Sequence, residues 1–270
     1  MDPPDPFRVL TRNIWNRFGP WPERLAAIRA GIAELAPDII GLQEVLRVDA
    51  KTGDGLDQAS LIADGFGYHI AYGRTTAELA YGNAILSRWP IARTHVFPLP
   101  GIGTDEHRNL LFAEIDAPFA KVPFFTTHLN WKLHHGYVRE VQVREVADRV
   151  RALAPSTGFP AIVVGDFNAD TDSDEIRFMR GLTSLGGKSV YFADAFADAG
   201  DGSRGVTFSR SNPYAAQVHE PDRRLDYVFV RGPDDRWRGE VRDARVCFDQ
   251  PAANGVWPTD HFGVTATIQR

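Results

Sequence analysis

The apolar residues of this chain fall into short runs, and most of these runs end in a polar or acidic residue. FRVLTRN ends on Asn13, DIIGLQEV carries Glu44 near its end, and AIVVGDFN turns acidic at Asp166. Short runs that are rich in β-branched residues and bounded by Gly, Pro, Asn or Asp are typical of buried strands. We therefore expect sheets whose strands carry polar side chains at their ends, where residues distant in the sequence can meet.

Two longer segments have helical periodicity instead. Residues 22–36 place apolar side chains three and four positions apart until Pro37 ends the pattern, and residues 137–154 repeat this spacing with valines. Further strands are expected over residues 67–73, 83–88, 110–116, 122–129, 224–231, 241–249 and 261–268, and loops over 51–60, 98–107 and 200–222.

This order of elements predicts one domain. A length of 270 residues allows one large domain or two small ones, and we find no linker or internal repeat that separates two halves. Strands mixed with a few helices favour an α/β (α+β) fold in which helices cover large sheets. Residues 7–270 are assigned to this domain, and the Pro- and Asp-rich residues 1–6 are assigned to a flexible N-terminal arm.

Charge and composition narrow the classes of function. The 35 acidic residues outnumber the 30 basic ones, and this excess disfavours non-specific binding of nucleic acid through a basic face. A local basic patch is not excluded by the net charge. No apolar run approaches the roughly 20 residues of a membrane span, and no signal peptide is visible. The single cysteine, Cys247, excludes an internal disulfide and favours a cytoplasmic location. Its alternating sequence context predicts a small buried residue.

The polar residues at the strand ends form the candidate site. They supply carboxylate and amide oxygens and two imidazoles, a donor set that suits a hard cation, Mg²⁺ first and Mn²⁺ second. Such a site could polarise a phosphoryl oxygen and activate water, with a histidine that orients or moves a proton. The eight residues are Asn13, Glu44, His128, Asp166, Asn168, Asp226, Asp260 and His261.

Structural interpretations of these residues stay open beside the functional ones. They are a turn cap for Asn13, a surface acid for Glu44, an Asx turn for Asp166 and Asn168, a salt bridge to Arg223 or Arg224 for Asp226, and a core position for His128. Three tryptophans near these segments, Trp15, Trp21 and Trp131, could line a substrate cleft by stacking or pack in the core.

The ordered series N…QE…H…GDFN…D…DH resembles the endonuclease/exonuclease/phosphatase (DNase I-like) superfamily. The resemblance runs from about residue 7 to residue 268 and so covers nearly the whole chain. It implies a four-layered sandwich of two mixed β-sheets flanked by helices, and a metal-dependent hydrolase of phosphate esters. Members act on DNA, RNA, phosphoinositides, sphingomyelin and nucleotide cofactors, so the fold does not determine the substrate.

The same resemblance implies a role for each motif residue. The metal or its waters would be held by Asn13, Glu44 and Asp260. The attacking water would be positioned or activated by Asp166 and Asn168 of GDFN. The remaining roles are His261 facing the scissile phosphate, Asp226 orienting that histidine, and His128 on a phosphoryl oxygen. Asn83 in YGNAILSR and Arg139, in an H…R..Q pattern with His128, resemble substrate-binding residues, with a solvated helix face as the alternative for Arg139.

These observations favour a phosphodiesterase whose phosphorylated substrate is a small molecule, a lipid headgroup or a single strand. A DNA endonuclease or exonuclease is the alternative within the superfamily. A catalytically inactive phosphate-binding module is the alternative from another class, and it is weakened because no acid or imidazole of the series is missing. We find no feature that predicts an oligomer.

Overall fold

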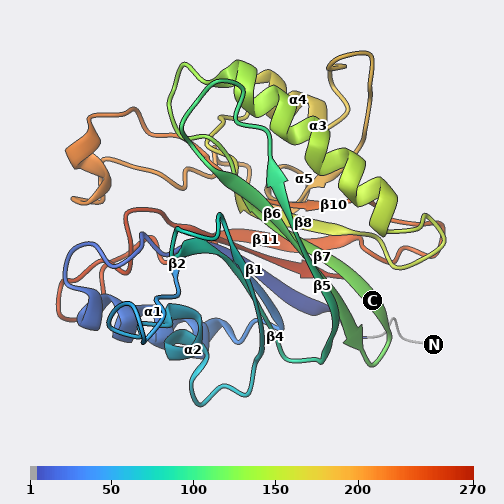
Figure 1. Ribbon diagram of the computed structural model, residues 1–270. Coiled ribbons are helices and arrows are strands. Elements are labelled where there is room, and N and C mark those ends of the chain that lie inside the picture. The colour runs from blue at the N-terminus through green and yellow to red at the C-terminus, as the bar shows by residue number, and fades with distance from the viewer. Residues whose placement is uncertain (1–4) are drawn as a thin grey trace.

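Two six-stranded sheets lie face to face in the middle of the structure (Figure 1). The computed structural model describes residues 5–270. The predicted flexible arm over residues 1–6 falls mostly on residues 1–4, which lie outside the described residues.

Both sheets are mixed. In spatial order the first contains β11 (Val241–Cys247), β12 (Gly263–Ile268), β1 (Phe7–Asn13), β2 (Ile39–Leu46), β4 (Tyr81–Ser87) and β3 (His69–Arg74). The second contains β5 (Ile91–Leu99), β6 (Arg108–Ala117), β7 (Ala120–His128), β8 (Ile162–Asp166), β10 (Asp226–Val230) and β9 (Ala193–Asp194). The parallel pairs are β1 with β2 and β7 with β8, and the other neighbours run antiparallel.

Helices cover the outer faces of both sheets, as Figure 1 shows. The first sheet packs against α1 (Trp21–Leu35) and α2 (Gln58–Ala63), and the second packs against α3 (Gly136–Leu153) and α4 (Asp174–Met179). The connections contain the short helices α5 (Ala195–Ala199) and η1 (Ala215–Val218). The four-layered sandwich of two mixed sheets flanked by helices is therefore confirmed. Within residues 5–270, no helix has the length and apolar character needed to cross a membrane.

Alternating side chains along the strands build three apolar layers. In β8, Ile162 and Val164 join the layer between the sheets, whereas Val163 joins the layer under α3. In β1, Val9 belongs to the layer between the sheets and Leu10 to the layer under α1. Successive residues of a strand point to opposite faces, so a strand covered on both faces must be apolar at every position. This requirement explains the continuous apolar runs of the sequence.

The prediction of a loop over residues 51–60 is wrong for its last residues, which begin a helix. Helix α2 begins at Gln58 because the side chain of Asp57 accepts a hydrogen bond at 3.0 Å from the backbone N–H of Ser60. An aspartate in this position satisfies one of the unpaired N–H groups at the start of a helix. The loop expected over residues 200–222 likewise contains the short helix η1.

Strand β5 lies at the edge of the second sheet and was not expected. Residues 92–95 are exposed, so β5 lacks the apolar run by which the other strands are recognised. The strand extends to Leu99, and the loop expected over residues 98–107 therefore begins only after it. Cys247 is buried as predicted, and burial raises the pKa of its thiol to about 12.

The tight packing of Gly41 against the opposite sheet gives a stability prediction. A Cβ added at Gly41 in β2 would lie 2.3 Å from Cγ2 of Val164 and 2.9 Å from Oγ1 of Thr126, both on the opposite sheet. Overpacking of this kind typically costs about 1–3 kcal/mol. We expect Gly41→Ala to lower the free energy of unfolding in urea by that amount. At Gly158 an added Cβ meets only an ordinary contact of 3.4 Å, so Gly158→Ala should stay within about 0.5 kcal/mol of the wild type. Equal stability of the two variants would contradict this account.

Candidate active site

Three neighbouring strands of the second sheet place Asp166 between a histidine and another acid. His128 at the end of β7 pairs in register with Asp166 at the end of β8, and Asp166 pairs with Asp226 at the start of β10. Residues paired across neighbouring strands point to the same face of a sheet. The polar ends of these apolar runs therefore meet at one edge, as the sequence pattern predicts.

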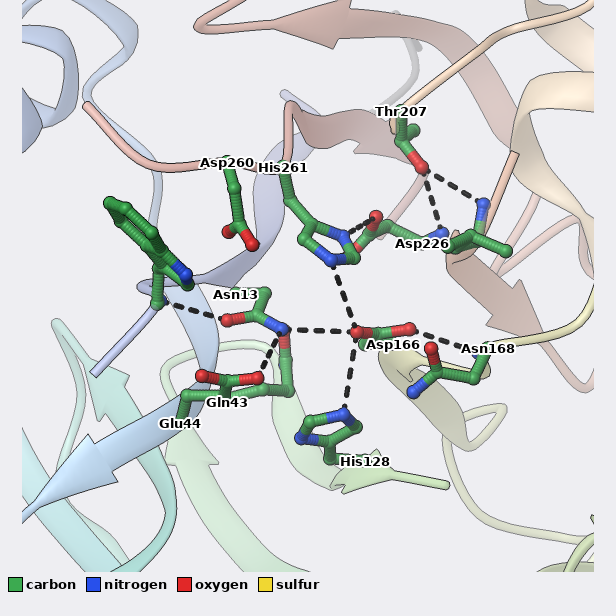
Figure 2. A network of polar contacts seen from close by, with 12 residues as sticks. Asn13, Gln43, Glu44, His128, Asp166, Asn168, Thr207, Asp226, Asp260 and His261 are labelled. Atoms are coloured by element: carbon green, nitrogen blue, oxygen red, sulfur yellow. Dashed lines mark hydrogen bonds and ion pairs between the residues drawn. The ribbon is translucent and has the colours of Figure 1, made fainter. Parts of the chain in front are cut away.

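The first sheet contributes Asn13 and Glu44 to the same place. Glu44 has a positive φ of 59° where the pairing of β2 with β4 is interrupted, and such irregularities re-aim a side chain. Nδ2 of Asn13 donates to Oε1 of Glu44 at 3.2 Å and to Oδ2 of Asp166 at 3.0 Å, so this amide joins the two sheets (Figure 2). Oδ1 of Asn13 accepts from the backbone N–H of Trp15 at 2.9 Å. Asn13 therefore caps the turn after β1, as the structural interpretation predicts, and also contacts the acidic residues of the site.

Thr259 anchors the segment that carries Asp260 and His261. Its hydroxyl donates to the carbonyl oxygen of Asn13 at 3.0 Å and accepts from the backbone N–H of His261 at 3.0 Å. Nδ2 of Asn212 donates to the carbonyl oxygens of Thr259 at 2.7 Å and of Asp260 at 3.2 Å. These bonds hold the segment against the end of β1, beside the residues described above.

The hydrogen bond expected between His261 and Asp226 is present. Nδ1 of His261 lies 2.9 Å from Oδ2 of Asp226, as Figure 2 shows. The alternative salt bridge from Asp226 to Arg223 or Arg224 is wrong, because both arginines pair with other carboxylates. The other ring nitrogen of His261, Nε2, lies 3.7 Å from Oδ2 of Asp166.

Asp166 lies at the centre of the polar network (Figure 2). Its Oδ2, which accepts the hydrogen bond from Nδ2 of Asn13, also lies 3.5 Å from Nε2 of His128. Its Oδ1 accepts from the backbone N–H of Asn168 at 2.9 Å, which is the Asx turn considered as an alternative. Asn168 has a positive φ of 50°, and its Nδ2 donates to the carbonyl oxygen of Leu129 at 3.1 Å. The turn engages one oxygen of Asp166, and the other oxygen faces the two imidazoles.

The two histidines differ in charge. Burial alone would lower the pKa of His261, but the surrounding carboxylates, Asp226 first, outweigh it and hold this pKa well above its ordinary value. Burial raises the pKa of Asp226 to about 6, so the proton shared by the pair resides on the imidazole at neutral pH. Burial, followed by the charge of Arg108, holds the pKa of His128 well below its ordinary value. His261 is therefore an imidazolium and His128 is neutral.

Arg108, which the sequence analysis missed, sets the tautomer of His128. Nη1 of Arg108 lies 3.2 Å from Nδ1 of His128 and donates to the hydroxyl of Tyr81 at 3.1 Å. A guanidinium can only donate, so Nδ1 of the neutral ring accepts and Nε2 carries the hydrogen. That hydrogen points toward Asp166. Arg108 begins a strand after a loop, and nothing in its local sequence distinguishes it from a solvated arginine.

Glu44 and Asp260 form an acidic pair that fits a divalent cation. Burial, then the charge of Asp260, raises the pKa of Glu44 to about 7, and burial also raises the pKa of Asp260. Carboxylates that resist ionisation next to each other are stabilised in their charged forms by a bound cation. Their oxygens, with the amide of Asn13, make a hard donor set.

A second group of side chains could also hold an ion. Potential ligand atoms of Asp166, Asp226 and His261 lie within 4.8 Å of one another, and all three residues are buried. In the described part of the chain, Oδ1 of Asp226 has no hydrogen-bond partner. Against this arrangement, Nδ1 of His261 already bonds Oδ2 of Asp226, and the charged ring would repel a cation.

The site opens into a cleft of about 670 Å³. Glu44, Asp260 and the two imidazoles line it, together with Asp166 and Asn168. Asn13 and Asp226 are buried and do not line the cleft themselves, but each contacts a residue that does.

Asn83 and Arg139 do not line the cleft. Nδ2 of Asn83 donates to Oδ1 of Asn109 at 2.8 Å, inside the structure. Nε of Arg139 donates to Oε1 of Glu175 at 2.8 Å, and its Nη1 donates to the carbonyl oxygen of Lys132 at 2.8 Å. Arg139 is buried, so the alternative prediction that it lies on a solvated helix face is wrong. These contacts favour structural roles, and substrate binding by either residue stays a prediction.

The acidic pair yields a prediction of opposite effects on stability and cation binding. A pKa of Glu44 raised from 4.5 to about 7 means that its contribution to stability is present below pH 4.5 and is lost as the pH rises through 7. We expect Glu44→Gln to raise the Tm of the cation-free protein at pH 8 by a few degrees, on the scale of about 2–4 °C per kcal/mol. It should also abolish most of the Tm increase that Mg²⁺ causes in the wild type.

The exposed Glu34 on α1 provides the matched control. Glu34→Gln should leave both Tm values unchanged in differential scanning fluorimetry. A full Mg²⁺ response in Glu44→Gln would exclude Glu44 as a cation ligand.

Comparisons with solved structures show the same fold. An endonuclease/exonuclease/phosphatase from Beutenbergia cavernae aligns with a TM-score of 0.74 at 26% identity, over 98% of this chain and 72% of that chain. TDP2 from D. rerio, complexed with single strand DNA product, aligns with a TM-score of 0.75 at 18% identity, over 98% and 99%. The human Nocturnin catalytic domain with bound sulfate anion aligns with a TM-score of 0.72 at 19% identity, over 98% and 94%.

A comparison with curated proteins finds no match. The model of the Endonuclease/Exonuclease/phosphatase family matches residues 11–261, which span every candidate site residue from Asn13 to His261. Members of this family are phosphoesterases. The order of the polar motifs in the sequence and their meeting at one edge of the sheets agree with that match. The chain therefore belongs to the endonuclease/exonuclease/phosphatase family.

Proposed function

We propose that this protein is a divalent-cation-dependent phosphodiesterase that acts on a small molecule, a lipid headgroup or a single strand. The observation that carries the proposal is the position of Asp166, which faces a charged and a neutral imidazole beside the acidic pair of Glu44 and Asp260. A site that only bound phosphate would gain nothing from these carboxylates, since they repel an anion.

Glu44 and Asp260, with the amide of Asn13 supporting Glu44, would hold Mg²⁺, with Mn²⁺ as a second choice. When bound, the ion would polarise a phosphoryl oxygen and offset the negative charge of the cleft. We favour this pair over Asp166, Asp226 and His261 as the cation site. In the latter group both ring nitrogens of His261 carry hydrogens that point toward the two carboxylates, so the ring cannot act as a ligand.

Asp166 and Asn168 would position the attacking water. Burial alone would raise the pKa of Asp166, but the positive charge of His261 and the hydrogen bonds from Asn13 and Asn168 outweigh burial, so this pKa lies below its ordinary value. An ionised carboxylate can accept a hydrogen from water and align its lone pair on phosphorus. The side chain of Asn168 lines the cleft next to it.

His261 and His128 would stabilise the charge that develops on the phosphoryl oxygens. Both present Nε2 to the same carboxylate oxygen, at 3.7 Å and 3.5 Å, and both Nε2 atoms carry a hydrogen. Donors fixed in advance toward one point stabilise a developing negative charge without reorganisation. The buried Asp226 keeps the His261 ring charged and oriented.

A nuclease activity is the second candidate. Its support is the family match and the fold shared with a TDP2 described with a single strand DNA product. The excess of acidic over basic residues, 35 against 30, disfavours a long duplex, because duplex binding draws most of its affinity from phosphate neutralisation by Lys and Arg. A cytoplasmic location, inferred from the single buried cysteine, is part of the proposal.

A substrate panel tests the proposed function. With Mg²⁺ we expect hydrolysis of bis-p-nitrophenyl phosphate and of short single strands, and loss of activity in EDTA. Full activity in EDTA, or cleavage of duplex DNA with a kcat/KM above every smaller substrate, would overturn the proposal. Binding of these substrates without turnover would identify an inactive binding module instead.

Asp166→Asn should lower kcat by about a hundredfold or more, the usual scale for a positioned base. The variant keeps the size of the side chain but loses the negative charge, so its effect on Tm should be small compared with its effect on turnover. Asp172→Asn, at an exposed position shortly after the motif, is the matched control and should retain full activity. A large loss of stability with near-normal kcat would mean that GDFN serves only as a turn.

Asp226→Asn should lower kcat and shift its pH dependence. Removal of the carboxylate lowers the pKa of His261, so the imidazolium is lost at a lower pH, and the alkaline limb of the kcat profile should move to lower pH. The measurement is kcat between pH 5 and pH 9 with saturating Mg²⁺. An unchanged alkaline limb would show that the charge on His261 does not contribute to catalysis.

A further inference from the structure

Large apolar side chains stand exposed around the acidic cleft. Phe18, Leu79, Trp131 and Val218 are 56%, 44%, 49% and 55% exposed, and all four line the cleft. Single exposed apolar residues are ordinary on a protein surface, but a group that borders an active site marks a place where a ligand covers apolar area.

Trp131 is half exposed, and its ring is not stacked on another ring of the described residues. It follows His128 by three residues, and no residue within 5–270 makes a ring or cation–π contact with its indole. The other cleft tryptophan, Trp15, stacks on Tyr214 at 4.7 Å and has the guanidinium of Arg24 4.8 Å from its centroid. The ring of Trp15 is therefore already engaged by other residues of the protein, whereas the ring of Trp131 can receive a planar group.

The charges of the cleft limit what that group can carry. Six acidic residues line it and only two arginines do; the acids are Glu44, Asp105, Glu106, Asp166, Glu220 and Asp260. The two arginines already pair with lining acids, Arg108 with Glu106 and Arg223 with Glu220. The positive charge of each arginine is therefore already offset by a neighbouring carboxylate. Together, one bound divalent cation and the imidazolium of His261 would still leave the lining net negative, so each further negative charge on a ligand is disfavoured.

We infer that the cleft selects a singly charged phosphodiester with an aromatic substituent, and that this substituent stacks on Trp131. The inference rests on the proposed function, because it places the phosphodiester at the Asp166 centre. Trp131 is then a specificity-determining residue. A nucleobase or a phenyl ring would satisfy it, whereas a polyphosphorylated ligand or a long duplex would not.

Direct binding tests the inference without requiring turnover. In titration calorimetry with Mg²⁺ present, three ligands share one methyl phosphodiester: dimethyl phosphate, methyl phenyl phosphate, and methyl phenyl phosphate with a second phosphate on the para position. We expect methyl phenyl phosphate to bind about tenfold or more tightly than dimethyl phosphate, the scale of one stacking contact. The doubly phosphorylated ligand should bind more weakly than methyl phenyl phosphate.

Variants test whether the ring of Trp131 causes the preference for methyl phenyl phosphate over dimethyl phosphate. Trp131→Ala should bring the two singly charged ligands within about twofold of each other, and Trp131→Phe should restore most of the preference. Trp237→Ala, at a tryptophan that is 62% exposed outside the cleft, is the matched control and should keep the full preference.

Three outcomes overturn the inference: no preference in the wild type, a preference that survives in Trp131→Ala, or tighter binding of the doubly phosphorylated ligand. Failure of the proposed function is distinct from these. In that case methyl phenyl phosphate would still be preferred, but bis-p-nitrophenyl phosphate would not be hydrolysed with Mg²⁺.

Discussion

The carboxylate of Asp166 is the group around which both sheets assemble their polar residues. It accepts a hydrogen bond at 3.0 Å from Asn13 of the first sheet and faces Nε2 of His128 in the second sheet at 3.5 Å. Because Asp166 ends a strand buried on both faces, its charge must be compensated within the protein. The compensating donors converge on one point, and a set of donors fixed in this way also suits the oxygens of a phosphoryl group.

The environment makes two chemically identical imidazoles different. His261 lies among carboxylates and keeps its proton, whereas His128 lies against Arg108 and stays neutral. The acids divide in the same way: the pKa of Asp166 is lowered and that of Glu44 is raised to about 7. One cleft therefore offers an ionised acceptor, two Nε2–H donors and an acidic pair that favours a cation. This separation of roles within a shared site suits the proposed hydrolysis of a phosphate ester.

The sequence predicted sheets covered by helices, and the meeting of the strand ends, because both follow from local patterns. The four-layered sandwich was predicted only by the resemblance to the family. A strand covered on two faces needs a continuous apolar run, and the residue that ends the run, such as Asp166, then lines the cleft. The role of Arg108 could not be predicted, because it depends on the contact between this side chain and His128, twenty residues away in the chain. Edge strand β5 was missed since exposure removes the apolar pattern. Arg139 carries a motif resemblance, yet its contacts lie in the interior.

The position of the bound cation distinguishes the acidic pair of Glu44 and Asp260 from the group of Asp166, Asp226 and His261. Crystals grown with Mn²⁺ would show the ion by its anomalous scattering, whatever the substrate. We expect one peak within ligand distance of the carboxylates of Glu44 and Asp260, with the hydrogen bond between His261 and Asp226 intact. A peak enclosed by Asp166, Asp226 and His261 and none at Glu44 would contradict it, since Asp166 would then be a metal ligand rather than the acid that positions water.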